Sequence, residues 1–129
     1  MQVFRLDGAL AAAGDALARP EGQTSARWRV LAAIEQEPLT VAQIARAWSL
    51  ARQSVQRIAD ALEADGLVSF EDNPRDRRAR LATLTAGGRE TLTRIQAAQL
   101  AWANELGEQI GAADLDAAAA VLARLLSVV

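Results

Sequence analysis

The amino-acid sequence predicts a mainly α-helical domain with one small β-hairpin, an α+β arrangement. Most of the chain has apolar residues that recur every three or four positions, which is the period of an amphipathic helix. One segment, Gly66–Thr85, instead holds two short apolar runs, Leu67–Phe70 and Leu81–Leu84, on either side of Asn73-Pro74. Proline fixes φ and asparagine can bond its own backbone, so this pair predicts the turn of a hairpin.

Helices are expected on both sides of the hairpin. Apolar spacing and helix breakers predict them over about residues 2–19, 24–34, 41–48, 52–65, 86–108 and 114–127, with a very short strand possible at Pro38–Thr40. Thr24 or Ser25 begins the second helix, Gly66 is a left-handed C-cap for the fourth, and Thr85 caps the fifth.

This order is that of a winged helix-turn-helix, a mainly helical DNA-reading architecture. We predict one domain over residues 1–129, in which about 24–85 form the winged-helix DNA-binding unit. Residues 1–23 and 86–129 would be N- and C-terminal dimerisation helices, because the small central unit cannot cover their apolar faces.

Composition excludes several function classes. The chain has no cysteine and no histidine, which removes thiol chemistry, the usual zinc ligands and the usual general base. With no tyrosine and no phosphate-binding glycine loop, we expect no catalytic residues, no metal and no cofactor. No apolar run approaches the length of a membrane span, and the N-terminus has no signal pattern, so we expect a cytoplasmic protein without a membrane partner.

Positive charge is concentrated at the turn of the predicted hairpin, where it could contact DNA. The net charge of −2 argues against indiscriminate coating of nucleic acid. The hairpin turn nevertheless carries four arginines, which cannot be buried unpaired: Arg75, Arg77, Arg78 and Arg80.

The helix over residues 52–65 separates into two faces. Its apolar face holds Val55, Ile58, Ala59 and Leu62. The first two turns of its polar face carry only arginine and glutamine, which can bond guanine, adenine or phosphate, whereas the acidic residues come later. Taken alone, this face could equally be an ordinary solvated surface. The neighbouring short helix and basic hairpin favour DNA reading. For Asp60 we expect an ion pair with Arg57, three residues away.

Three segments resemble the MarR family of bacterial winged-helix regulators: RQSVQRIADALEADGLV (Arg52–Val68), NPRDRRARLATLTAGG (Asn73–Gly88) and, more loosely, ARWRVLAAI (Ala26–Ile34). The resemblance implies a homodimer with interlocked terminal helices. It also implies that residues 52–65 read the major groove and that the wing tip enters the minor groove.

The resemblance also assigns roles to individual residues. Those implied to contact DNA are Arg52, Gln53, Ser54, Gln56 and Arg57 on the helix and Arg75, Arg77 and Arg78 on the wing. Arg77 is the minor-groove candidate, and Asp76 would brace a neighbouring arginine. The family usually has Ser or Thr where Ala51 stands, and often Gly where Ser49 stands, so this recognition helix lacks its usual cap.

The predicted function is that of a sequence-specific transcriptional regulator, a homodimeric repressor of a near-palindromic operator in double-stranded DNA. The resemblance also implies release by a small aromatic ligand, for which Trp28 and Trp102 are candidate pocket residues. For Trp28 and Trp48 we favour positions in the core, since tryptophans on apolar helix stripes are usually buried. The alternative is a winged-helix protein–protein interaction module that does not bind DNA.

Overall fold

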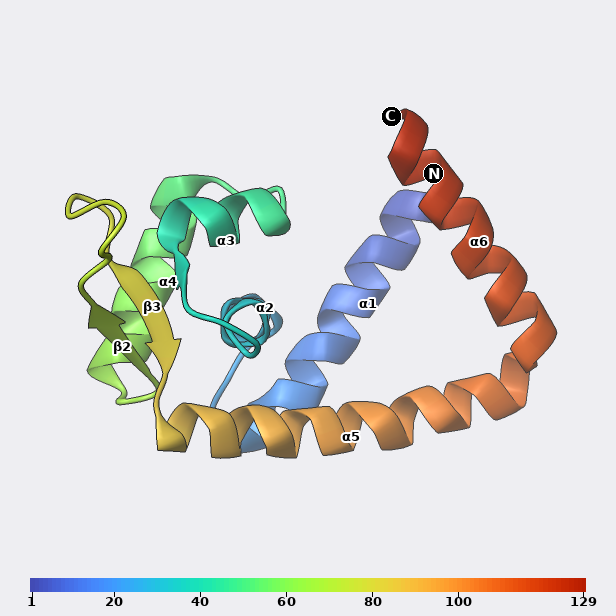
Figure 1. The fold of residues 1–129 in the computed structure, drawn as a ribbon. Helices are drawn as coiled ribbons and strands as arrows, with labels where there is room; N and C mark the ends of the chain where they lie inside the picture. Colours follow the sequence, from blue (N-terminus) through green and yellow to red (C-terminus); the bar gives the residue numbers. More distant parts are fainter. The chain divides into compact units, whose positions relative to one another are not determined.

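A computed structural model describes all residues from Met1 to Val129 and confirms a mainly helical fold with a small antiparallel sheet (Figure 1). The chain divides into two compact units, Met1–Gln96 and Ala97–Val129. The helices are α1 (Gln2–Ala18), α2 (Ser25–Ala33), α3 (Val41–Ala47), α4 (Arg52–Ala64), α5 (Ala86–Ile110) and α6 (Ala112–Val128), with a 3-10 turn η1 (Arg19–Glu21). The strands are β1 (Leu39–Thr40), β2 (Val68–Glu71) and β3 (Leu81–Leu84).

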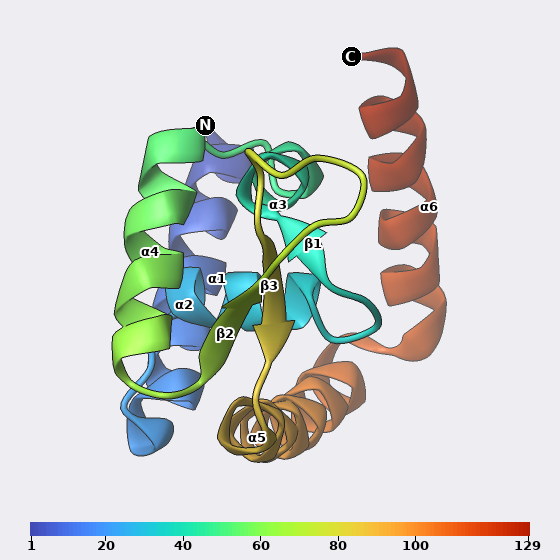
Figure 2. The same ribbon diagram turned by 60° about the vertical axis from the view of Figure 1, so that its left-hand side comes forward.

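The sheet has three strands in the order β1-β3-β2, all antiparallel (Figure 2). Strands β2 and β3 are the predicted hairpin, in register from Val68 opposite Leu84 to Glu71 opposite Leu81. The short strand β1 pairs Leu39 with Ala82 on the other edge of β3. Because β3 pairs with both β1 and β2, the wing is joined to the segment that precedes α3.

The core of the first unit lies between α2, α3, α4, the sheet and the start of α5. Its largest fully buried side chains are Leu31, Ile44, Leu62, Leu92, Ile95, Val30, Val55 and Val68. Both apolar α4 residues in this set, Val55 and Leu62, come from the face that the sequence predicted to be buried. The opposite, polar face of α4 is therefore exposed.

Several helix ends follow the predicted chemistry. Thr24 accepts a hydrogen bond from the Arg27 amide, and Thr85 accepts one of 3.0 Å from the Gly88 amide, so both cap their helices. Gly66 has a φ of 75°, which is typical of a left-handed C-cap. The turn before α4 is less favourable. Ser49 has a φ of 51°, a region that favours glycine, and Ala51 offers no side-chain cap.

The prediction that Trp48 is a core residue is wrong. Its side chain is 41% exposed, and the guanidinium of Arg29 lies over its ring at 5.7 Å. Helix α3 ends at Ala47 and Trp48 is its C-cap, so the helical period that placed the indole on the buried stripe no longer applies. Trp28, by contrast, packs against the core and is half buried.

The second unit contains the end of α5 and all of α6, joined at Gly111, whose φ is 94°. Its apolar side chains are largely exposed in the single chain: Leu100, Ile110, Val121, Leu122, Leu125, Leu126 and Val128. Trp102 is half buried. None of the helices in either unit combines the length and apolar character needed to span a membrane.

Candidate nucleic-acid interface

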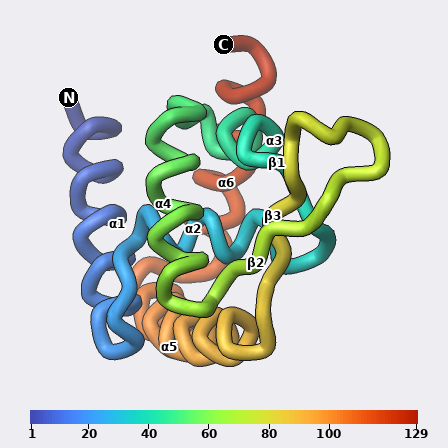
Figure 3. The backbone as a smooth tube through the Cα atoms, turned by 90° about the vertical axis from the view of Figure 1, so that its left-hand side faces the viewer, coloured from blue at the N-terminus to red at the C-terminus, as the bar shows by residue number.

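Helix α4 and the wing, the β2–β3 hairpin with its loop, present the predicted contact residues to solvent. Figure 3 shows the loop between β2 and β3 extending past the sheet beside α3. On α4 the exposed side chains are those of Arg52, Gln53, Ser54, Gln56 and Arg57, and on the wing those of Arg75, Arg77 and Arg78. Each predicted site residue is thus accessible from outside.

Two side chains shape the wing loop from within. The Oδ1 atom of Asn73, which is buried, accepts a 3.0 Å hydrogen bond from the Arg75 amide. The Oδ1 atom of Asp76 accepts one of the same length from the Arg78 amide. Both are Asx turns, in which a short polar side chain replaces a backbone acceptor. Asp76 therefore holds Arg78 in place through the backbone amide, and the guanidinium groups of the wing tip make no bond to Asp76.

The arginines predicted to contact DNA have no carboxylate partner. The ion pairs of the structure involve only Arg27, Arg80 and Arg94 among the basic residues. Five exposed guanidinium groups are therefore unpaired, those of Arg52, Arg57, Arg75, Arg77 and Arg78. Unpaired arginines gathered on one surface are the electrostatic pattern of a phosphate-binding face.

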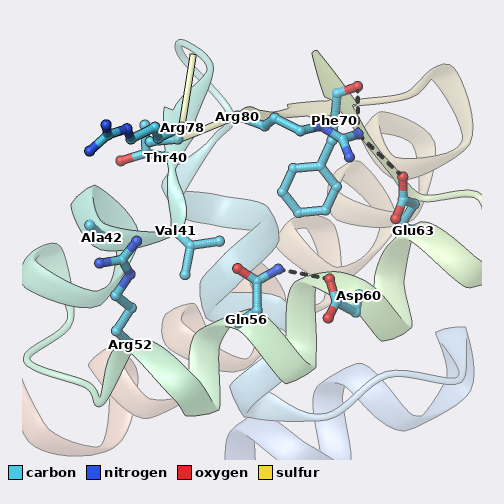
Figure 4. A pocket seen from close by; sticks show the side chains of 11 residues that line it. Thr40, Val41, Ala42, Arg52, Gln56, Asp60, Glu63, Phe70, Arg78 and Arg80 are labelled. Carbon is cyan, nitrogen blue, oxygen red and sulfur yellow. Dashed lines mark hydrogen bonds and ion pairs between the residues drawn. The ribbon is translucent and has the colours of Figure 1, made fainter. Parts of the chain in front are cut away.

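The tertiary structure brings the start of α4 close to the wing. A pocket of about 180 Å³ lies between them, lined by Arg52, Gln56, Asp60 and Glu63 of α4 and by Phe70, Arg78 and Arg80 of the wing (Figure 4). A second pocket of about 630 Å³ lies on the other side of Arg52 and is lined by Arg46, Arg52 and Arg75 among others. Helix and wing therefore form one continuous surface, with arginines from both elements along it.

Arg46 is the residue that sequence reasoning missed. It lies in the last turn of α3, is exposed, and lines the same pocket as Arg52 and Arg75. Its position six residues before Arg52, in the helix that precedes the recognition helix, was the available signal. In helix-turn-helix proteins the first of the two helices crosses the DNA backbone.

Arg80 differs from the other wing arginines because its exposed side chain contacts other residues of the protein. Its guanidinium donates to the Phe70 carbonyl at 3.2 Å and lies 5.0 Å from the centre of the Phe70 ring. It also lies 3.9 Å from the Glu63 carboxylate on α4. These contacts join the returning strand of the wing to the second half of α4, which makes Arg80 a positioning residue.

The predicted ion pair between Arg57 and Asp60 is wrong. Asp60 Oδ1 instead accepts a 2.8 Å hydrogen bond from the amide nitrogen of Gln56, one turn earlier (Figure 4). Residues three and four apart are both neighbours on a helix, so spacing alone did not decide between the two partners.

The two aromatic candidates lie in different compact units of the chain. Trp28 belongs to the first unit and Trp102 to the second. Near Trp28, Arg27 pairs with Asp65 and Arg29 stacks on Trp48. Both guanidinium groups beside Trp28 therefore have partners within the protein.

Comparison with known proteins agrees with this geometry. The fold and its exposed basic helix and wing define a winged-helix transcription regulator, and a sequence model of the MarR family matches residues 22–79. An uncharacterized protein of Mycobacterium tuberculosis, Rv2011c, is 37% identical over 124 residues, covering 96% of this chain and 87% of the relative. The chain belongs to the MarR family.

Solved structures extend the likeness over nearly the whole chain. The transcriptional repressor CouR bound to a 23-mer DNA duplex has a TM-score of 0.89 and 27% identity, covering 97% of this chain and 89% of CouR. The MarR family regulator SP03579 has a TM-score of 0.88 and 25% identity, covering 96% and 83%. The winged-helix fold predicted from the sequence is confirmed.

Proposed function

We propose that the protein is a homodimeric repressor that binds a near-palindromic operator through α4 and the wing. The observation that carries this proposal is the set of five exposed, unpaired arginines shared by the two elements. Such a surface gains affinity by releasing counterions from phosphates. The structural similarity to a repressor crystallised on DNA supports the same reading.

Each contact residue has a proposed role. The polar first half of α4 enters the major groove, where Gln53 and Gln56 read base edges and Arg52 and Arg57 bind bases or phosphate. Arg77 at the wing tip enters the minor groove, and Arg75 and Arg78 bind phosphates, joined by Arg46 from α3. Arg80 does not contact DNA in this proposal, because its contacts lie within the protein.

The exposed apolar side chains support a homodimer. Four of them lie on α1, namely Val3, Phe4, Leu6 and Leu10, and others lie on α6 in the second unit. Exposed apolar side chains in this number are unusual on a monomer and would be covered in a symmetric dimer. A two-fold dimer would place its recognition helices about 10 bp apart on DNA.

Selection of bound DNA from a random pool tests the proposal. Enrichment of a palindromic sequence is the expected result, and fluorescence anisotropy on that sequence should show a steep loss of affinity with salt. Arg77→Ala and Arg78→Ala should each weaken binding. If neither variant changes the affinity, the wing is not part of the interface. If no sequence is enriched, an interaction module that does not bind DNA becomes the better reading.

We further propose that a small aromatic ligand releases the regulator from DNA, with Trp28 and Trp102 as stacking surfaces. Both indoles are half buried, so a ligand ring could reach them without unfolding the core. Titration with a panel of aromatic carboxylates should quench their fluorescence and lower operator affinity. Trp28→Leu and Trp102→Leu should each reduce the ligand response but leave DNA binding intact. A response equal to that of the wild type in both variants would place the ligand elsewhere.

A further inference from the structure

We infer that Asp60 determines the base preference of α4 by fixing the orientation of the Gln56 amide, although Asp60 itself makes no DNA contact. The inference rests on the proposed insertion of α4 into the major groove. It concerns one hydrogen bond, from Gln56 Nε2 to Asp60 Oδ1 at 2.8 Å, between two exposed residues one turn apart.

The direction of this hydrogen bond is set by chemistry. An ionised carboxylate has only acceptors, whereas the glutamine amide has an acceptor oxygen and a donor nitrogen. The reversed amide would place its oxygen against the carboxylate, which is repulsive. Asp60 therefore holds the nitrogen of Gln56 towards itself and turns Oε1 the other way. In Figure 4 that oxygen points to the side of the pocket where Arg52 lies.

Asp60 is free to act in this way because the arginines nearby are not bound to it. Arg57 makes no ion pair, and the wing residue Arg80 lies 3.9 Å from Glu63 instead. A guanidinium on Asp60 would have competed for the same carboxylate oxygens. Glu63 therefore pairs with Arg80, and Asp60 remains available to bond Gln56.

The orientation of the Gln56 amide determines which bases it can bond in the major groove. With its nitrogen bonded to Asp60, the Gln56 amide offers Oε1, which can only accept a hydrogen bond. In the major groove the bases that donate are adenine, through N6, and cytosine, through N4. Guanine and thymine offer acceptors to the same position. Gln56 held by Asp60 should therefore select a base with an exocyclic amino group and reject guanine and thymine.

The experiment compares base preferences at the position that Gln56 reads. DNA is selected from a random pool with the wild type and with Gln56→Ala, and the base pair whose preference changes identifies the position. Anisotropy then gives the affinities for its four variants. We expect the wild type to favour adenine or cytosine by about five- to tenfold, and Asp60→Ala to reduce this preference to about twofold or less.

Three further variants separate orientation from charge. Asp72→Ala removes an equal charge from an exposed side chain that makes no ion pair, so it should keep the preference. In the Gln56→Ala background, Asp60→Ala should have no further effect on it. Asp60→Lys offers a donor in place of an acceptor, so it should reverse the amide and shift the preference towards guanine or thymine.

The outcomes distinguish this inference from the proposed function. If the wild type enriches no DNA, both are overturned. If it enriches an operator but Gln56→Ala leaves the profile unchanged, only the inference is overturned. The same holds if the wild type prefers guanine or thymine, if Asp60→Ala or Asp60→Lys keeps the wild-type preference, or if Asp60→Ala still acts without Gln56. In each of those cases DNA binding itself stands.

Discussion

Gly88 in the first turn of α5 is the position where a single added methyl group should do most harm. A Cβ at this residue would lie 2.0 Å from the carbonyl oxygen of Leu67 and 3.1 Å from Leu84 Cδ2. The first is backbone and cannot rotate away. An ordinary van der Waals contact begins at 3.4 Å, so the start of α5 would have to move from the base of the wing by about 1.4 Å.

That movement breaks contacts whose cost can be worked out. The amide of Thr85 donates to the Leu67 carbonyl at 3.2 Å, and the Thr85 hydroxyl donates to Gly66 O at 2.7 Å. Losing one such bond costs about 1 kcal/mol, and overpacking adds about 1–3 kcal/mol. The better helix propensity of alanine returns about 1 kcal/mol. We expect Gly88→Ala to lower the free energy of unfolding by about 1–3 kcal/mol.

Gly87→Ala is the matched control, since its Cβ would find nothing nearer than 3.7 Å, at Gly66 O. Urea unfolding followed by circular dichroism, at one protein concentration, measures both variants against the wild type. Gly87→Ala should unfold at the wild-type midpoint or slightly above it. A wild-type midpoint for Gly88→Ala, or an equal loss in both variants, would refute the steric argument.

Three further predictions concern the recognition helix, the wing and the apolar surface. Ala51→Ser supplies the missing cap of α4 and should add about 1 kcal/mol, raising Tm by about 3–5 °C in a thermal melt; Ala51→Val, which cannot cap, should not. Asp76→Ala should weaken operator binding, although it removes a negative charge, because the Arg78 amide loses its hydrogen-bond acceptor. Asp76→Asn keeps an acceptor and should bind the operator at least as well as the wild type. Tighter operator binding by Asp76→Ala would show that the charge of Asp76 matters more than its hydrogen bond in the turn. Leu122→Glu and Leu125→Glu place charge among exposed apolar side chains of α6 and should convert a dimer to monomers in sedimentation experiments. Asp116→Arg, at an exposed position of α6 outside this apolar patch, should leave the mass unchanged.

The sequence alone was sufficient for the features that depend on neighbours along the chain. The two faces of α4, the left-handed Gly66 and the Asn73 turn all follow from local geometry, because helix period and turn chemistry act over only a few residues. The exposure of the wing arginines also follows from the sequence, since this many charges cannot be buried without partners. These features were enough to predict the winged helix.

Which arginines stay free was decided by the tertiary structure. Arg80 looks like Arg75, Arg77 and Arg78 in sequence, yet the antiparallel register places it beside Phe70 and within reach of Glu63 on α4. Arg46 joins the basic surface only because β1 pairs with β3 and brings the wing loop next to α3. Both outcomes depend on contacts between segments far apart in the chain, which no local period encodes.

The two acidic residues of α4, Asp60 and Glu63, show the same division between sequence and tertiary structure. Spacing allowed Asp60 to bond either Arg57 or Gln56, since both are one turn away. Packing of the wing against α4 occupies Glu63 with Arg80, and Asp60 bonds Gln56. The sequence by itself determined that a polar, arginine-rich helix and a basic wing exist on one fold. Only the folded chain decided how their side chains pair, because each pairing is a competition among partners that the tertiary structure brings together.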